Sequence, residues 1–215
     1  MAARRVDRLA DLVAQIRQDG GVATAVATDV VHRDQVDKLA TETLKQFGKV
    51  DVLINNAGIM PLSPIGKLRV AEWDRTIDVN VKGLLYCVAA FLPMMLQAGE
   101  GHIVNVGSLA GRRPFPGGTV YSASKSAVRA ISAGLRAELS PSDNIRVTDI
   151  EPGLVATELA DHIPDREMQQ TFVQRWEGKR QLAAEDIARA ILFVVSQPEH
   201  VNVNELLVRP TEQDT

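Results

Sequence analysis

The stretch Val50-Asp51-Val52-Leu53-Ile54-Asn55-Asn56-Ala57-Gly58 joins a short apolar run to a polar turn that ends in glycine. A short apolar run closed by turn residues is typical of a strand that is covered on both faces. Asparagine and glycine then supply the turn chemistry that leads from a strand into a helix. The stretch therefore predicts one parallel strand of an α/β sheet.

The same alternation of short apolar runs and longer amphipathic stretches continues along the chain. It indicates βαβ units, and the predicted fold is a doubly wound, Rossmann-like parallel sheet in a single domain spanning residues 1–215. The expected strands are 22–27, 50–54, 102–106, 145–150 and 205–208. The expected helices are 5–18, 33–47, 70–97, 120–139 and 184–196.

Composition excludes several classes of function. The net charge of −3 gives no electrostatic reason to bind nucleic acid or an anionic membrane. The single cysteine, Cys87, excludes an internal disulfide and stands in an apolar run, which favours a buried, unreactive thiol. The sequence has no apolar run of membrane-spanning length, and its first residues lack the apolar core of a signal peptide. We therefore expect a cytoplasmic protein.

Polar or glycine-bearing residues follow four of the expected strands. They are Asp29, the run at 55–58, Gly107-Ser108 and Pro152-Gly153. Ligands of open parallel sheets bind beyond the carboxyl ends of the strands. Each position alone fits ordinary turn chemistry, but four of them in register predict one crevice.

The segment Tyr121-Ser122-Ala123-Ser124-Lys125 places a phenol and an ammonium group four residues apart, on one face of a helix. A phenol titrates near ~10 in water, and a fixed cation lowers its pKa toward the range of efficient acid–base catalysis. Ser108, thirteen residues before the tyrosine, would hold a carbonyl or alcohol oxygen against the phenol. This pattern favours carbonyl/alcohol redox chemistry; in isolation, Tyr121 and Lys125 would be an ordinary surface pair.

Together these motifs resemble the short-chain dehydrogenase/reductase family. The resemblance rests on Asn-Asn-Ala-Gly at 55–58, on Asn80 within 78–83, on Ser108, on Tyr-x-x-x-Lys at 121–125 and on Pro152-Gly153. Their order and spacing agree from about residue 4 to the C-terminus. Tyr-x-x-x-Lys alone is weak, but the combination is specific. The ending 203–211 resembles the branch with NADP-dependent 3-hydroxy acid and serine dehydrogenases.

The resemblance implies a nicotinamide cofactor, no metal, and a role for each matched residue. Tyr121 would pass the proton to or from the substrate oxygen, while Lys125 would lower the tyrosine pKa and bind the nicotinamide ribose. Ser108 would position the substrate oxygen, and Asn80 would hold a water that links Lys125 to solvent. The expected cofactor contacts are Asp29 and Val30 at the adenine, Asn56, Ala57 and Gly58 along the adenosine, and Pro152, Gly153, Val155 and Thr157 at the nicotinamide. Alternatively, Asn80 only caps a turn and Asp29 only caps the following helix.

Cofactor choice depends on the residues after the second strand of such a fold. A carboxylate there binds the ribose 2′-hydroxyl of NAD, whereas arginine accommodates the 2′-phosphate of NADP. Arg4 and Arg5 occupy the corresponding place, and no carboxylate precedes Asp7. The sequence therefore predicts NADP over NAD. The alternative is two solvated arginines at a helix start.

The glycine-rich turn that should receive the cofactor pyrophosphate is not found in the sequence. The family pattern places it in a βαβ opening of about 30 residues, and Ala2-Ala3-Arg4-Arg5 matches the end of that opening. We expect two absent strands between 22–27 and 50–54, unpaired edges there, and poor folding or weak NADP binding. Either Met1 is an internal methionine of a longer protein, or the chain is a truncated, inactive relative.

The leading hypothesis is an NADP-dependent oxidoreductase that interconverts a small alcohol and a carbonyl compound, with Tyr121 as general acid and base. The rival is an inactive family member that acts only by association. The apolar run 84–95 and the small residues of 120–133 would form the interface of a homodimer or homotetramer. The polar stretch 158–180 is either a lid over the site or a solvated connection, and Arg112 and Arg113 are candidates for a substrate carboxylate.

Overall fold

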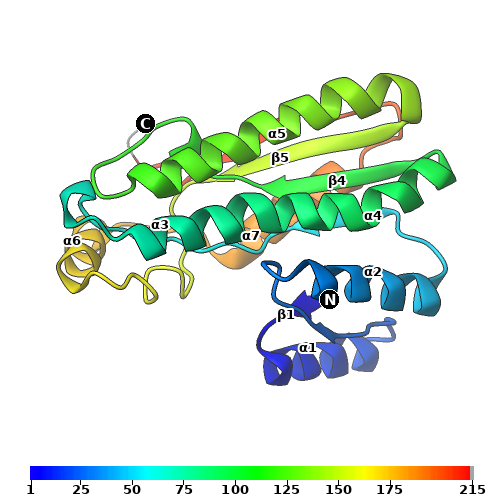
Figure 1. Ribbon diagram of the computed structural model, residues 1–215, viewed down its shortest axis with the longest axis horizontal. Coiled ribbons are helices and arrows are strands. Elements are labelled where there is room, and N and C mark those ends of the chain that lie inside the picture. Colours follow the sequence, from blue (N-terminus) through cyan, green and yellow to red (C-terminus); the bar gives the residue numbers. More distant parts are fainter. Residues whose placement is uncertain (214–215) are drawn as a thin grey trace.

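A four-stranded parallel sheet forms the centre of the protein (Figure 1). The computed structural model describes residues 1–213. The strand order is β3-β4-β5-β6, with β3 at Val52–Asn55, β4 at Gly101–Val106, β5 at Ile145–Pro152 and β6 at Glu205–Val208. A second, two-stranded parallel sheet pairs β1 (Ala2–Ala3) with β2 (Val26–Ala27). The predicted α/β fold with a parallel sheet is confirmed.

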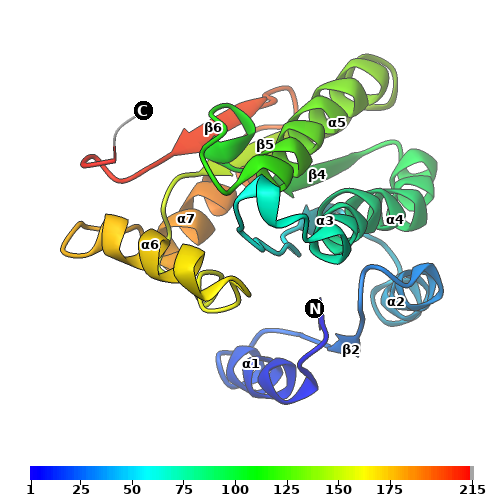
Figure 2. The same cartoon turned by 60° about the vertical axis from the view of Figure 1, so that its left-hand side comes forward.

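Helices cover both faces of the four-stranded sheet, as the two views in Figures 1 and 2 show. α4 (Leu84–Ala98) and α5 (Thr119–Asp143) lie on one face, and their apolar side chains pack on Leu53, Ile103 and Val147. α7 (Ala184–Val195) covers the other face. The remaining helices are α1 (Val6–Gln18), α2 (Arg33–Phe47), α3 (Val70–Ile77) and α6 (Arg166–Trp176), with short 3-10 turns at Ile65–Lys67 and Leu109–Gly111.

The expected helix 70–97 is wrong in one respect, because a π-helical turn at Asp78–Gly83 interrupts it. Wide turns of this kind often mark functional sites, and this one carries Asn80. The expected strand 22–27 is reduced to Val26–Ala27, because its partner β1 offers only two residues for pairing. α6 was not expected; it lies within the polar stretch 158–180.

The edge of β3 that faces away from β4 pairs with no strand among residues 1–213. Val52 and Ile54 are 38% and 46% exposed there, which is high for apolar residues of a central α/β strand. The β1–β2 sheet and α1 lie apart from this edge, and α2 connects them to the core by packing on α4 (Figure 2). The unpaired edge at β3 agrees with the expectation from the sequence.

The segment Val70–Ala98 is long and apolar enough to cross a membrane by length and composition alone. A core helix of a globular protein passes the same test. Here Cys87, Phe91 and Met95 of α4 are buried against the sheet. The burial of this face accounts for the apolar composition of the helix.

Candidate active site

The predicted site residues converge at the carboxyl edge of β3, β4 and β5. Gly58 follows β3, Ser108 follows β4, and Gly153 follows β5, whose last residue is Pro152. Tyr121 lies in the first turn of α5, which packs along β5. These segments therefore meet at one edge of the sheet, where the sequence predicts a crevice.

Tyr121 and Lys125 both point into the interior from the same face of α5. The Lys125 ammonium nitrogen lies 6.0 Å from the centre of the Tyr121 ring. Burial raises the pKa of the Tyr121 phenol, while a hydrogen bond with Ser108 acts in the opposite direction. The net direction differs from the expected lowering, because the desolvation of the phenolate by burial outweighs the hydrogen bond with Ser108.

Lys125 is buried. Its Nζ donates a hydrogen bond of 2.8 Å to the carbonyl oxygen of Val106, the last residue of β4. Burial lowers the pKa of the ammonium group to about 8, and Asp149 opposes that shift. Lys125 is therefore largely protonated at pH 7, which leaves it able to stabilise an anion.

Asn80 and Gly58 lie beside this ammonium group. The Asn80 side chain accepts from the Ile59 backbone N–H at 2.8 Å and donates to the Ile59 carbonyl oxygen at 2.9 Å and to Ser124 Oγ at 3.0 Å. A Cβ at Gly58 would lie 3.4 Å from Asn80 Oδ1 and 3.6 Å from Lys125 Nζ. A methyl group at this position would therefore be in ordinary van der Waals contact with both polar groups.

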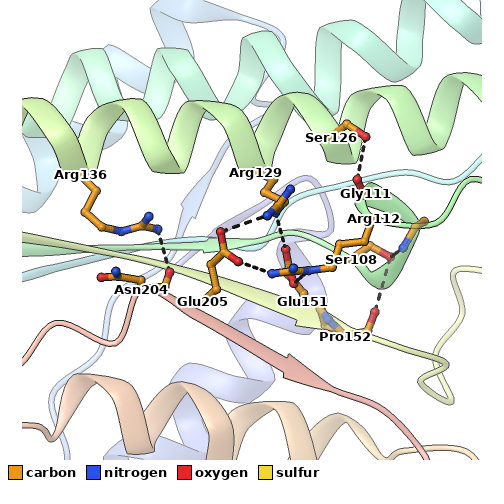
Figure 3. Close-up of polar contacts among 11 residues, drawn as sticks. Ser108, Gly111, Arg112, Ser126, Arg129, Arg136, Glu151, Pro152, Asn204 and Glu205 are labelled. Carbon is orange, nitrogen blue, oxygen red and sulfur yellow. Dashed lines mark hydrogen bonds and ion pairs between the residues drawn. The ribbon is translucent and has the colours of Figure 1, made fainter. Parts of the chain in front are cut away.

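Ser108 lies within hydrogen-bonding reach of the Tyr121 phenol. Its hydroxyl accepts a hydrogen bond from Ala110 N at 3.1 Å and donates a long one, 3.5 Å, to the carbonyl oxygen of Pro152 (Figure 3). The hydroxyl is half-buried, so it is accessible from the crevice. The weak bond to Pro152 makes it available to another acceptor.

The expected adenine side of the site is a shallow pocket of about 420 Å³. Arg4 and Asp29 line it together with Val31 and residues of α3 and the π-helical turn. Asp29 Oδ1 accepts from Val31 N at 3.3 Å within the turn before α2, but the N-cap of α2 is His32, so the alternative that Asp29 caps this helix is wrong. Arg5 does not join this pocket.

Arg5 instead lies in an ion pair with Glu158, at 2.7 Å. Arg8 of α1 contacts the other oxygen of the same carboxylate, also at 2.7 Å. These two arginines lower the pKa of Glu158 to about 2. The pair Arg4 and Arg5 is thus divided between the pocket and the segment that follows β5.

The other expected cofactor contacts differ in accessibility. Asn56 and Ala57 are exposed, Val30 is half-buried under Gly83, and Val155 is half-buried. Thr157 is exposed, and its hydroxyl accepts a long hydrogen bond, 3.3 Å, from Leu159 N. Gly153 is covered from the other side by the side chains of Arg209 and Gln213.

The stretch 158–180 folds over the tyrosine. Tyr121, Met60, Leu62, Ala110 and Ile163 form one apolar cluster. Leu159, Met168 and Phe172 pack against the same cluster from the 158–180 stretch, together with Phe115. The side of the crevice next to the phenol is therefore apolar.

The comparisons with known proteins agree with this geometry. Residues 1–168 match the family model described as short chain dehydrogenase. An uncharacterized oxidoreductase of Staphylococcus saprophyticus is 44% identical over 214 residues, covering 99% of this chain and 85% of its own length. The chain belongs to the short-chain dehydrogenase family.

Solved structures of similar proteins show the same fold. The closed form of serine dehydrogenase complexed with NADP+ superposes with a TM-score of 0.89 at 34% identity, covering 100% of this chain and 85% of that one. An alcohol dehydrogenase from the archaeon Thermococcus sibiricus, complexed with 5-hydroxy-NADP, gives 0.86 at 27% identity, with 100% and 86% covered. This chain is thus an oxidoreductase of that family with a Rossmann-like fold.

The structure of this short-chain dehydrogenase also contains buried polar residues that the sequence motifs did not indicate. Glu151 of β5 is buried, and Arg112 and Arg129 converge on it and on Glu205 of β6 (Figure 3). Arg112 is therefore engaged by carboxylates of the protein itself, which contradicts its expected role toward a substrate. The alternation along 145–152 could have shown that Asp149 and Glu151 share one face of β5.

Proposed function

We propose that this chain is an NADP-dependent oxidoreductase that interconverts a small alcohol and the corresponding carbonyl compound. The observation that carries the proposal is the placement of the Lys125 ammonium group 6.0 Å from the Tyr121 ring, with Ser108 and Asn80 at the same crevice. These four residues come from α5, from the segment after β4 and from the π-helical turn, and they meet at one crevice. That arrangement supports proton transfer at a substrate oxygen.

The residues divide the work of the reaction. A bound nicotinamide cofactor supplies or accepts the hydride. Ser108 holds the substrate oxygen by a hydrogen bond, and Tyr121 donates a proton to it in reduction or removes one in oxidation. Lys125 stabilises the phenolate form of Tyr121 by its charge. Asn80, fixed by three hydrogen bonds, lies in the π-helical turn beside Lys125 and would hold a water that links Lys125 to solvent.

The residues at the crevice fit such a cofactor. Lys125 donates one hydrogen bond to a protein carbonyl among the described residues, and an ammonium group has three protons to donate. Gly58 lies directly beside this ammonium group. Arg4 at the adenine-side pocket supplies a guanidinium group suited to the 2′-phosphate of NADP.

The remaining cofactor contacts follow the chain around the crevice. Asp29 and Val30 would bind the adenine, and Asn56, Ala57 and Gly58 the adenosine. Pro152, Gly153, Val155 and Thr157 would meet the nicotinamide end. Arg5 would contribute to the phosphate only after releasing Glu158.

We further propose that residues 158–180 act as a lid over an apolar substrate. Tyr121 is buried, and Leu159, Met168 and Phe172 are among the residues that cover its cluster. A substrate therefore reaches the phenol when this segment moves. The same residues would then exclude water from the reacting groups.

The test of the function is NADPH oxidation with a panel of small ketones and aldehydes. Tyr121→Phe removes the proton donor and should lower turnover by about 10²-fold or more. Tyr86→Phe, a half-buried tyrosine of α4, is the matched control and should retain activity. Equal turnover in Tyr121→Phe and the wild type would refute the role of the phenol.

The cofactor preference has a separate test. Arg4→Ala should raise KM for NADPH far more than KM for NADH, because only NADPH carries the 2′-phosphate. Arg33→Ala, an exposed residue of α2, is the control. Equal changes in the two KM values would exclude a contact between Arg4 and the phosphate.

We also propose that the protein is a cytoplasmic homodimer or homotetramer. Leu85 and Leu96 of α4 are exposed, at 42% and 44%, on the helix expected to form the interface. Cys87 is a free, buried thiol, and burial raises its pKa to about 11, which suits a reducing compartment. Sedimentation of the wild type and of Leu85→Lys would show whether this face associates.

A further inference from the structure

Asp149 is a buried carboxyl group for which the mechanism above has no role. It is 0% exposed in the middle of β5, on the face covered by α5. Neither carboxylate oxygen accepts a hydrogen bond from the residues that the structure describes. A buried acid without hydrogen bonds is energetically costly, so it is kept neutral or is compensated by a nearby charge.

The side chain of Asp149 lies directly beneath the catalytic edge of the sheet. β4 and β5 pair Asn105 with Asp149 and Val106 with Ile150. A Cβ at Gly107 would lie 3.1 Å from the Cγ of Asp149 and closer still to Oδ1, so the carboxyl group rests against the residue that follows Val106. The Val106 carbonyl oxygen holds the ammonium group of Lys125.

Lys125 and Asp149 are near one another but not in contact. Lys125 has no ion pair within 4.0 Å among residues 1–213. Their charges nevertheless interact, and Asp149 is the carboxylate that raises the pKa of Lys125 against the effect of burial. Charges buried in the interior are screened much less than surface charges, so this attraction acts across the gap.

The other charges around Asp149 come from four segments of the chain. On β5, Glu151 lies two residues away on the same face, and Glu205 comes from β6. Both are held by Arg112, which follows the 3-10 turn, and by Arg129 of α5 (Figure 3). These two carboxylates are therefore already compensated.

The pKa of Asp149 is raised to about 7: burial, Glu151 and Glu205 raise it, whereas Lys125 and the backbone of Gly107 lower it. The carboxyl group thus changes its charge close to neutral pH. Its influence on Lys125 is present above that pH and absent below it.

We propose that Asp149 is a positioning residue for proton transfer: its buried carboxylate is the counter-ion that keeps Lys125 an ammonium ion beside Tyr121. This inference rests on the proposed function, because Lys125 matters through the phenol that it supports. Asp149 touches neither substrate nor cofactor. It acts on the reaction only by holding the charge of Lys125.

The test follows Lys125 directly by NMR titration of the full chain with ¹³C-labelled lysine, without cofactor. The Cε signal of Lys125 is assigned by its loss in Lys125→Arg. Asp149→Asn removes the charge and retains the shape, and should lower the titration midpoint of Lys125 by about one pH unit. Thr148→Val, buried on the opposite face of β5, should leave that midpoint unchanged.

A second measurement uses the wild type alone and stands even where Asp149→Asn does not fold. The Lys125 signal should show an additional small step near pH 7 as Asp149 loses its proton. A single-step curve in the wild type, or the same midpoint in Asp149→Asn as in the wild type, overturns the proposal.

Activity separates this inference from the proposed function. In an active enzyme, the alkaline limb of the kcat/KM profile for alcohol oxidation should move to lower pH in Asp149→Asn by the same amount as the NMR midpoint. An inactive wild type with the expected titration would refute the proposed reaction and leave the coupling of Asp149 to Lys125 established. An active wild type without the titration shift would support the proposed reaction and refute the coupling of Asp149 to Lys125.

Discussion

Asn105 of β4 is expected to be the most sensitive polar residue of the core, because it connects two other buried side chains. Its Oδ1 accepts from Asn55 Nδ2 at 2.9 Å, and its Nδ2 donates to Ser132 Oγ at 2.9 Å. Asn105 and Ser132 are fully buried. The network therefore joins β3, β4 and α5 near the carboxyl edge of the sheet.

Asn105→Ala should lower the free energy of unfolding by about 3 kcal/mol, since it removes two hydrogen bonds of about 1 kcal/mol each and leaves the buried Asn55 amide without its partner. For a chain of this size the melting temperature should then fall by about 6–12 °C. Ser132→Ala should be milder, at about 1 kcal/mol, because it removes a single side-chain contact of Asn105. The two changes share one bond, so they should not add in the double mutant.

The assay is urea unfolding followed by circular dichroism, with the slope m used to check that the denatured state is unchanged. Gln46→Ala, exposed on α2, is the control and should stay within about 0.5 kcal/mol of the wild type. If Asn105→Ala were no more destabilising than this control, the buried network would have no energetic role and the reasoning would be refuted.

Three further predictions concern glycine, the lid and pH. Gly107→Ala should lower the free energy of unfolding by about 1–3 kcal/mol, because the added Cβ would overlap Asp149. Gly134→Ala, in open space on α5, should raise it by about 0.5–1 kcal/mol in the same urea assay. Asp165 caps α6 by accepting a hydrogen bond from Met168 N, and it binds the Lys67 ammonium group at 2.7 Å. Asp165→Ala should therefore speed proteolysis within 158–180 with little change in the free energy of global unfolding. Unchanged cleavage would argue against a separately anchored lid. Burial lowers the pKa of His102 from 6.5 to about 4. As the pH falls, the unfolded chain therefore takes up a proton before the folded chain does, and the free energy of unfolding should fall by up to about 3 kcal/mol between pH 6.5 and 4. His102→Gln should remove this pH dependence.

Much of the architecture followed from local patterns. The apolar runs at 102–106 and 205–208 became β4 and β6 within one residue, because parallel strands buried on both faces leave a continuous apolar signal. The helix at 33–47 was predicted to the residue, since its amphipathic pattern ends at Gly48, which adopts the left-handed conformation. The break at Asp78–Gly83 was missed because a π-helical turn leaves the apolar period nearly intact.

The sequence by itself determined the family and the α/β fold class. The spacing of Tyr121 and Lys125, the serine thirteen residues earlier and the turn at 55–58 also predict which groups carry the chemistry. Only the tertiary structure decided the charges of those groups and their surroundings. Burial raises the pKa of the Tyr121 phenol and lowers that of the Lys125 ammonium group, and Arg112 is turned onto Glu151 and Glu205. The position of Asp149 near Lys125 also follows only from the pairing of β4 with β5. Such effects depend on desolvation and on contacts between residues far apart in the chain, and neither is encoded in local spacing.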